Sequence, residues 1–464
     1  MLVHPPRLRR FILWGLALCV AAFAGCRSLP RITPDMASRN AAPVHLDSAH
    51  GPLSAARSKA IIDSLKQRAD GTSLLDRHLA LEEALAGSPL VTGNKVTLLQ
   101  DGAATYRAML AAIHDARDHI HMESYIFEDD ATGRLFAGAL LAKQRQGVRV
   151  SIIIDAVGAM GTPDTFFKPL VDAGAALLKF NPINPLAAKA GWNVNERDHR
   201  KLLIVDGRIA FLGGINISGV YSGGSLKSVP REGSRLPWRD THVQIEGPVV
   251  AEYQKIFLES WKTQKGPPLP PQNLFPPLAA RGKEIVRAIA GSPAEPVSAI
   301  YATLISAIES AETEVLLTNA YFAPDPQLRA TLKDAVRRGV DVKLILPSHT
   351  DSALIFHAGR SYYEEMLRAG IKIYERRDAL LHAKTATIDG VWSTIGSTNL
   401  DWRSFLHNQE VNAVVLSPDF AAQMKRVFEQ DLAASTQITL QAWEQRPLGF
   451  RIKETFARMW EYWL

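Results

Sequence analysis

One polar motif occurs twice in this chain of 464 residues. Both copies fit H-x-K-x4-D-x6-G-[GS]-x-N, so each supplies a histidine, a lysine, an aspartate and an asparagine in the same order. These residues are His199, Lys201, Asp206 and Asn216 in the first copy and His382, Lys384, Asp389 and Asn399 in the second. Two long copies in one chain are far less frequent by chance than a single short motif. The pattern therefore marks a candidate site.

These residue types suit chemistry at phosphorus. One imidazole can attack phosphorus and form a covalent intermediate. The other can protonate the leaving oxygen and then deprotonate the incoming alcohol or water. Lysine ammonium groups and asparagine amides would hold the nonbridging oxygens and stabilise their charge in the transition state. Two such sets that face one another predict a phosphate site with two histidines.

The spacing within each copy predicts a β-hairpin. A histidine and a lysine two residues apart on a strand point to the same face. The Asp-Gly pairs at 206–207 and 389–390 are typical of hairpin turns. The returning strands, 209–212 and 392–395, would bring the asparagine back beside the histidine. The aspartate completes the motif, but from its place at the turn we expect it to support the structure rather than react.

The two imidazoles need different protonation states at rest, one neutral and one cationic. A carboxylate beside one ring would orient it and raise its pKa. Asp240 and Glu410 are candidates, since each precedes an apolar strand, 243–245 or 411–416, downstream of a motif. A surface salt bridge is the alternative for each carboxylate.

The motifs lie inside a longer repeat that predicts an α/β fold. Each copy begins with a helical stripe at spacing i, i+3, i+4, i+7. A strand, a second helix and another strand follow. The corresponding segments are 104–125 and 299–320, then 135–147 and 328–339, then 150–154 and 342–346. This order predicts two similar mixed-sheet α/β repeats, related by a pseudo-two-fold axis.

Composition and breaks in the pattern set the expected boundaries. Hydrophobic residues make up 47% and charged residues 22% of the chain, which excludes a disordered or polytopic membrane protein. The prolines between 266 and 280 interrupt regular structure. We expect a signal segment at 1–25, a tether with helical pieces at 26–90, repeat 1 at 91–265, a linker at 266–280, repeat 2 at 281–440 and an amphipathic helix at 441–464.

The N-terminus has the features of an export signal. Three arginines precede fourteen uncharged residues, 11–24, and the chain then reaches Gly25 and Cys26. The last four residues of this stretch resemble a bacterial lipobox, which would make Cys26 an acylated first residue; an uncleaved signal anchor is the alternative. Cleavage leaves a net charge of 6 − 3 = +3, a weak basis for nucleic-acid binding. We expect an exported chain, anchored to a membrane of the bacterial cell envelope.

The last residues predict a helix with one apolar face, formed by Ile452, Phe456, Met459, Trp460 and Trp463. Packing of this face on the core is the first interpretation, and contact with a membrane interface is the alternative.

The duplicated motif resembles that of the phospholipase D superfamily, and the resemblance covers roughly 91–435. Further stretches are similar to bacterial cardiolipin synthases: Leu98–Gly102, Glu123–Phe127, Trp238–Asp240 and Gly396–Ser404. The resemblance implies a phosphohistidine intermediate, with His199 as nucleophile and His382 as acid and base, and no metal or organic cofactor. Gly214 stands where this family commonly has serine, which would remove one hydroxyl group from the first half-site.

The expected function is therefore a phosphatidyltransferase acting on membrane phospholipids, best matched by cardiolipin synthesis from phosphatidylglycerol and a second phospholipid. One chain would suffice for one site, and no nucleic acid is expected as a partner. A hydrolase of the same mechanism, either a phospholipase D or a nuclease, is the first alternative. A non-catalytic envelope lipoprotein that binds phospholipid is the second.

Overall fold

The computed structural model describes residues 44–69, 71–76, 78–79, 87–184, 192–222 and 237–460. The predicted signal segment and Cys26 lie outside these residues, as does Trp463. Within the described residues, no helix has the length and apolar character needed to cross a bilayer.

The first repeat is a seven-stranded mixed sheet. Its order is β6–β5–β4–β8–β9–β11–β3, with β6, β5 and β4 parallel and the other neighbours antiparallel. The strands are β3 (Leu90–Gln100), β4 (His119–Ser124), β5 (Arg149–Asp155), β6 (Ala176–Phe180), β8 (Lys201–Val205), β9 (Ile209–Gly213) and β11 (Thr241–Glu246).

The second repeat has the same strand order, β15–β14–β13–β17–β18–β19–β12, and the same directions. Its strands are β12 (Glu284–Gly291), β13 (Glu314–Asn319), β14 (Asp341–Pro347), β15 (Lys372–Arg376), β17 (Lys384–Ile388), β18 (Trp392–Gly396) and β19 (Asn408–Leu416). A further strand, β20 (Ser435–Ile438), pairs with β15. The expected fold class of two similar mixed-sheet repeats is therefore confirmed.

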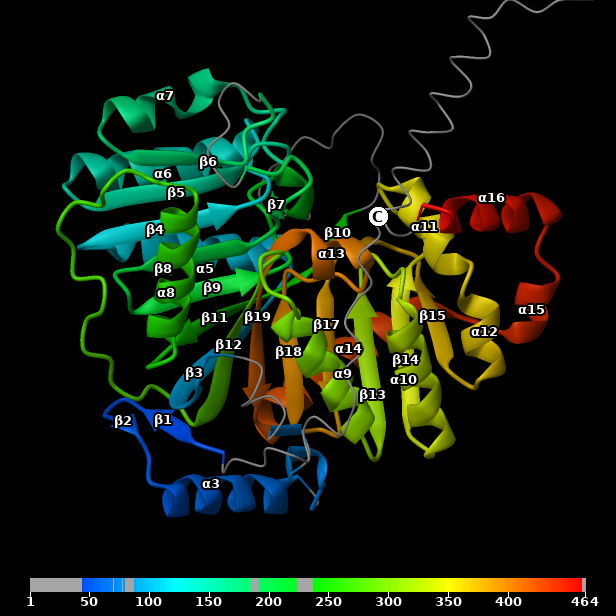
Figure 1. Ribbon diagram of the computed structural model, residues 1–464. Coiled ribbons are helices and arrows are strands. Elements are labelled where there is room, and N and C mark those ends of the chain that lie inside the picture. Colours follow the sequence, from blue (N-terminus) through cyan, green and yellow to red (C-terminus); the bar gives the residue numbers. More distant parts are fainter. Residues whose placement is uncertain are drawn as a thin grey trace, which may run out of the picture. The chain divides into compact units, whose positions relative to one another are not determined.

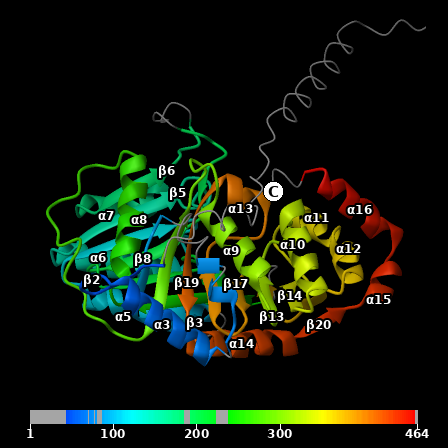
Figure 2. The ribbon, with the colours of Figure 1, turned by 60° about the horizontal axis from the view of Figure 1, so that its bottom comes forward.

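Helices cover both faces of these sheets (Figures 1 and 2). In the first repeat, apolar residues of three helices pack on one face, and those of α8 (Val250–Thr263) pack on the other. The three are α5 (Asp101–Asp115), α6 (Ala131–Arg145) and α7 (Asp164–Asp172). Their counterparts in the second repeat include α9 (Ala299–Ser310), α10 (Pro326–Arg337) and α14 (Pro418–Ala433).

The two sheets join edge to edge. Strand β3 pairs antiparallel with β12, so the last strand in the order of one repeat meets the last strand of the other. One apolar core spans this junction, and it contains side chains from α8, α14 and strands of both repeats. No helix or strand lies between α8 and β12, where the sequence predicts the proline-rich linker.

The N-terminal described segment joins the fold. It forms β1 (Leu46–Ser48), β2 (Gly51–Pro52) and α3 (Ala55–Arg68). Strand β1 pairs parallel with the start of β3. The sequence predicts helical pieces in this stretch but not the strand, because three residues are too few to show a periodic pattern.

The C-terminus differs from the first interpretation of its sequence. It forms α15 (Leu440–Glu444) and α16 (Leu448–Arg458), and α16 packs on α11 (Ala353–Arg360). The expected apolar face does not pack on the core: Ile452 is 69% exposed, Phe456 59% and Met459 65%. The helix is buried instead through Glu454 and Ala457 on its opposite side.

Candidate active site

Each motif histidine is fixed by backbone bonds to a strand of the other repeat. The short strand β7 (Arg197–Asp198) runs parallel to the start of β19, and the backbone N–H of His199 donates to Gln409 O at 3.0 Å. Equivalently, β16 (Leu380–Leu381) pairs with β10 (Trp238–Arg239). There the N–H of His382 donates to Arg239 O at 2.8 Å. These bonds place each imidazole beside the residue that follows the hydrogen-bond acceptor, which is residue 410 for His199 and residue 240 for His382.

That following residue is a carboxylate in both cases. His199 Nδ1 lies 3.0 Å from Glu410 Oε1, and His382 Nδ1 lies 2.7 Å from Asp240 Oδ2. All four side chains are buried. The two expected carboxylates are thus in contact with the histidines rather than in surface salt bridges, and each pair joins one repeat to the other. With Nδ1 engaged, Nε2 is the ring nitrogen left for a substrate.

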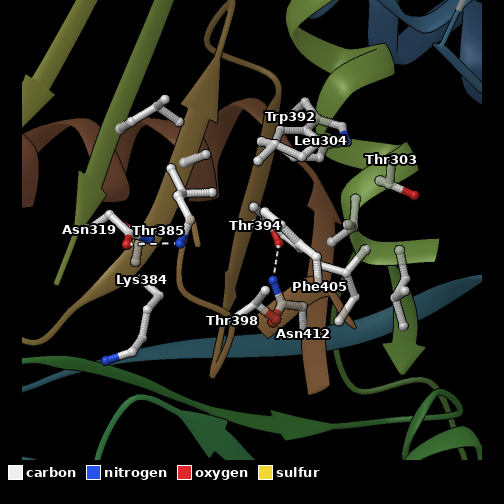
Figure 3. Close-up of a pocket in the computed structure, with 16 residues that line it drawn as sticks. Thr303, Leu304, Asn319, Lys384, Thr385, Trp392, Thr394, Thr398, Phe405 and Asn412 are labelled. Carbon is white, nitrogen blue, oxygen red and sulfur yellow. Dashed lines mark hydrogen bonds between the residues drawn. The ribbon is translucent and has the colours of Figure 1, made fainter. Parts of the chain in front are cut away.

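Each motif lysine lies beside its histidine, although the strand begins at the lysine and the histidine precedes it by two residues. Lys201 Nζ donates to the carbonyl of His199 at 2.5 Å and lies 5.2 Å from the ring centre of Tyr125. Lys384 Nζ lies 3.0 Å from His382 Nδ1. Figure 3 shows Lys384 at the margin of an apolar pocket between α9 and the sheet, with its ammonium directed away from Trp392 and Phe405. Neither motif histidine lines that pocket.

The two half-sites share one electrostatic environment. Burial lowers the pKa of His199 well below its usual value, and the positive charges of Lys201, Lys384 and His382 lower it further. Burial also lowers the pKa of His382, as Lys384 does, whereas Asp240 raises it. His199 is therefore neutral, as a nucleophile must be.

Burial also changes the ionisation of the flanking groups. It lowers the pKa of Lys201 to about 7 and that of Lys384 to about 8, against the opposing attraction of nearby carboxylates. Burial raises the pKa of Glu410 to about 7. Shifts of this size are typical of groups enclosed in a functional site. An anionic phosphodiester would restore the charge of both lysines by direct attraction.

The motif aspartates lie at the opposite end of the hairpins from the histidines. Asp206 accepts hydrogen bonds from the backbone N–H groups of Arg117, Asp118 and His119. Asp389 does the same for residues 312–314, at 2.8–3.0 Å. A strand of five residues, which spans roughly 17 Å, separates each aspartate from the end of the hairpin where the lysine lies. These hydrogen bonds hold the strands in register at the far end of each hairpin, and a structural role for both aspartates stays our prediction.

Both aspartates adopt the left-handed conformation that the Asp-Gly turns require. Asp206 has φ 53° and Gly207 φ 61°, while Asp389 has φ 48° and Gly390 φ 60°. Two consecutive positive φ values define the hairpin turn that these dipeptides predict.

The two motif asparagines have different surroundings. Asn216 Oδ1 accepts from the backbone N–H of Ile126, and its Nδ2 donates to the hydroxyl of Tyr221 at 2.9 Å. That hydroxyl lies 3.4 Å from His382 Nδ1. The Nδ2 group has a second N–H, so contact of the Asn216 amide with a nonbridging oxygen stays a prediction. Asn399 is buried, and its Oδ1 has no hydrogen-bond partner among the described residues.

Gly214 has a different consequence from the expected loss of a hydroxyl. A Cβ atom at this position would lie 2.2 Å from Asp240 Oδ1, so glycine makes room for the carboxylate. The equivalent Ser397 keeps its hydroxyl and donates it to Glu410 Oε2. The two half-sites therefore accommodate their carboxylates differently. The shorter Asp240 packs against glycine, and the longer Glu410 accepts a hydrogen bond from serine.

Sequence reasoning missed the groups that clamp the two repeats together. Arg200, between the motif histidine and lysine, donates to Glu410 O at 3.0 Å and to Gln409 Oε1 at 2.9 Å. Arg239 forms two bonds to Asp431 of α14, at 2.9 and 3.1 Å. Each arginine is adjacent to a residue already singled out, which is the one signal that the sequence offers.

Aromatic rings wall the histidines, and the sequence does not assign them this role. Tyr125 packs edge-on to His199 at 5.0 Å between ring centres. Tyr221, Trp238 and Tyr321 surround His382 at 5.6, 5.1 and 6.1 Å. Rings of this kind exclude water from the imidazoles. In the described part of the chain, no group of three or more His, Cys, Asp or Glu residues is arranged to hold a metal ion.

Two buried imidazoles, each oriented by a carboxylate and flanked by a lysine, define an enzyme that transfers a phosphorus-containing group through histidine. Comparison with known proteins identifies the family. The model of the family "Cardiolipin synthase, PLD-like domain" matches residues 109–221 and 304–432. The chain belongs to this family of phospholipase D superfamily enzymes.

Several curated relatives of this chain are named cardiolipin synthase. The cardiolipin synthase of Geobacillus kaustophilus is 35% identical over 384 residues, which cover 82% of this chain and 74% of the relative. Cardiolipin synthase A of Pseudomonas putida (strain GB-1) is 36% identical over 361 residues, or 76% and 72% of the two chains. The crystal structure of phosphatidylserine synthase from Haemophilus influenzae has the same fold, with a TM-score of 0.60 at 14% identity, covering 83% of this chain and 99% of that one.

Proposed function

We propose that this enzyme synthesises cardiolipin by moving a phosphatidyl group from one phosphatidylglycerol to the headgroup hydroxyl of a second phospholipid. The relatives named cardiolipin synthase support the reaction. The observation that carries the mechanism is that each histidine contacts a carboxylate from the other repeat. This contact orients both imidazoles and leaves Nε2 of each for the substrate.

In the first step, neutral His199 Nε2 attacks phosphorus and a P–N bond forms. The bond from phosphorus to the headgroup oxygen breaks, and His382 Nε2–H donates its proton to that oxygen, which releases glycerol. The bound phosphodiester carries one negative charge, which raises the pKa of His382 and so supplies the protonated acid that this step needs. Lys201 and Lys384 offset the charge that develops on the nonbridging oxygens.

In the second step, the neutral His382 removes a proton from the hydroxyl of the second lipid. The oxygen attacks phosphorus, the P–N bond breaks and His199 is regenerated. Attack by water instead would give phosphatidic acid, so the enzyme must keep its acceptor side dry. The tyrosine and tryptophan rings beside the histidines serve this purpose.

We also propose that the enzyme is exported and tethered to the cell envelope. This proposal rests on the basic, apolar and lipobox-like sequence of residues 1–26. Labelling with a radioactive fatty acid tests it: the wild-type chain incorporates label, and a Cys26→Ser chain does not. Label in both chains, or in neither, contradicts acylation at Cys26.

Thin-layer chromatography of lipid products from pure phosphatidylglycerol tests the reaction. We expect cardiolipin and glycerol from the wild-type enzyme, and a new phosphatidyl product when an excess of another alcohol is added. His199→Ala should abolish all products. Phosphatidic acid as the main product would establish a hydrolase, and equal inactivity of wild type and His199→Ala would leave only a lipid-binding role.

Trapping the intermediate tests the division of labour. His382→Ala should still form the phosphohistidine at His199 from a donor with a good leaving group, because such a donor needs no acid. Acid-quench mass spectrometry should then find the adduct on the peptide that contains His199. Glu410→Gln should slow its formation about 10²-fold, whereas Glu259→Gln on the exposed side of α8 should not. An adduct on His382 would reverse the assignment.

A further inference from the structure

The large apolar side chains that the described chain exposes are unevenly distributed. Most of them lie on α11, on α16 and the two residues after it, and in the segments that follow β5 and β6, whereas Leu135 on α6, Val171 on α7 and Phe275 lie elsewhere. The side chains in the former segments include Met160, Ile183, Val194, Leu354, Leu448, Ile452, Phe456, Met459 and Trp460. Exposed apolar side chains that gather in this way mark an interaction surface.

These segments lie at the edge of the sheet where the histidines lie. Strand β17 begins opposite the end of β13, and β13 runs parallel to β14, so His382 and the carboxyl end of β14 share one edge. Helix α11 follows β14 directly, and the hydroxyl of Tyr321, whose ring packs near His382, donates to Asp351 just before α11. In the first repeat, Asp155 at the end of β5 accepts from the N–H of Asp198, next to His199.

Helix α16 is the largest part of this surface, and both ribbon views place it beside α11 along that edge (Figures 1 and 2). Leu448, Ile452, Phe456 and Met459 are spaced by four, four and three residues, which puts them on one face. The opposite face is anchored: Glu454 bonds Arg446 at 3.0 Å, and Ala457 is buried. The fold therefore holds the apolar stripe outward.

The charges beside the stripe are positive. Arg451, Lys453 and Arg458 are the cations of α16, and the acid in this helix, Glu454, is buried against Arg446. An amphipathic helix with an apolar face and basic flanks lies in the interface of a membrane that contains anionic lipid. The proposed substrate is itself an anionic lipid, which must enter the site headgroup first.

We propose that the edge of the sheet around the two histidines rests on the surface of an anionic phospholipid bilayer, with α16 as its apolar contact and the loop after β5 as a second contact. The site then faces the headgroup layer, and donor and acceptor reach it without leaving the bilayer. The proposal deepens the proposed function, but its main test does not depend on catalysis.

A polarity-sensitive fluorophore tests the contact directly. The full chain carries only two cysteines, Cys19 and Cys26, which are replaced by serine. A single cysteine is then placed at Phe456, at Met160 or, as control, at Gly138, an exposed position on α6 with open space around it. Vesicles of phosphatidylglycerol should shift the emission of the labels at 456 and 160 to the blue, and lipid-borne quenchers should quench them. The label at 138 should not respond.

Two outcomes overturn the proposal. A response of the labels at 456 and 160 to vesicles that is no larger than that of the label at 138 shows that this edge does not touch the bilayer. A shift at 456 that develops without vesicles as the protein concentration rises identifies a second copy of the chain as the occupant.

Kinetics give a second readout. The triple variant Ile452→Ser, Phe456→Ser, Met459→Ser should raise KM for vesicle phosphatidylglycerol at least tenfold. It should leave kcat/KM unchanged for a short-chain, dispersed phosphatidylglycerol. Equal loss on both substrates contradicts a surface role. If no variant or wild-type chain is active, the proposed function fails, and the fluorescence result still decides the membrane contact.

Discussion

The side chains at two equivalent motif positions, 214 and 397, distinguish the half-sites. Gly214 leaves space for Asp240 beside His382, and Ser397 donates to Glu410 beside His199. A duplicated fold starts with two equal histidines, but nucleophile and acid need unlike surroundings. The shorter carboxylate on one side, and the longer one held by a hydroxyl on the other, provide that difference.

Gly214→Ala should displace Asp240, since the new Cβ would overlap its carboxyl group, and so lose the orientation of His382. We expect kcat to fall about 10- to 100-fold, as on weakening a general acid. Steady-state assays measure this. Gly138→Ala on α6, where a Cβ meets nothing within 4 Å, is the control and should keep full activity. Equal activity of the two variants would show that Asp240 does not need its present position.

The lowered lysine pKa values predict the alkaline side of the pH profile. In the free enzyme Lys201, with a pKa of about 7, and Lys384, with a pKa of about 8, lose their charge as the pH rises through this range. Because kcat/KM reports the free enzyme, it should decline above about pH 7 and more steeply above about pH 8. Bound phosphodiester raises both pKa values, so the decline in kcat should lie at higher pH. A kcat/KM that stays flat between pH 6 and 10 would contradict this.

At the scale of elements, the motif hairpins align the site from its far end. Strand β8 or β17 begins at the motif lysine, two residues after the histidine, and the aspartate that follows its other end binds the backbone that precedes β4 or β13. Both strands of each pair thus keep one register. The spacing between Lys and Asp in the motif is therefore the length of a strand.

Asp389→Ala should remove the acceptor for three backbone N–H groups and reduce the free energy of unfolding by about 2–4 kcal/mol. Denaturant melting measures the change. Asp334→Ala is the control, because Asp334 is half exposed in a surface pair with Arg337; it should change stability by less than about 0.5 kcal/mol. The folded fraction of Asp389→Ala should remain active, and a catalytic loss without a stability loss would restore Asp389 to the chemistry.

At the scale of the molecule, neither repeat holds a complete site. Pairing of β3 with β12 joins the sheets, and β7–β19 and β10–β16 bring each histidine to its carboxylate. Arg200 and Arg239 bind across the same junction. The duplication has therefore produced two half-sites that depend on one another.

A chain cut within 266–280 should be active only when both fragments are expressed together. Each histidine then regains the carboxylate of the other repeat, and the shared core holds the fragments together. Co-purification and lipid assays check both points. Activity of the first fragment alone at the level of the pair would show that paired copies of one repeat can replace the natural partner.

The sequence by itself determined the repeat, its helices and strands, and the Asp-Gly turns. These features depend on local periodicity and on φ values that few residues adopt, so neighbours along the chain encode them. The sequence did not predict the unequal environments of the two histidines. Nor did it predict the exposed face of α16, since an apolar stripe fits a core and a membrane equally well.

Only the tertiary structure decided which carboxylate serves which histidine. His199 and Glu410 are 211 residues apart, and His382 and Asp240 are 142 apart. No local pattern relates such positions, because their contact depends on how two separately formed sheets meet. The two sheets are held together by burial of one apolar core across β3 and β12. The hydrophobic effect is non-directional, so the sequence does not show which apolar residues will pack together.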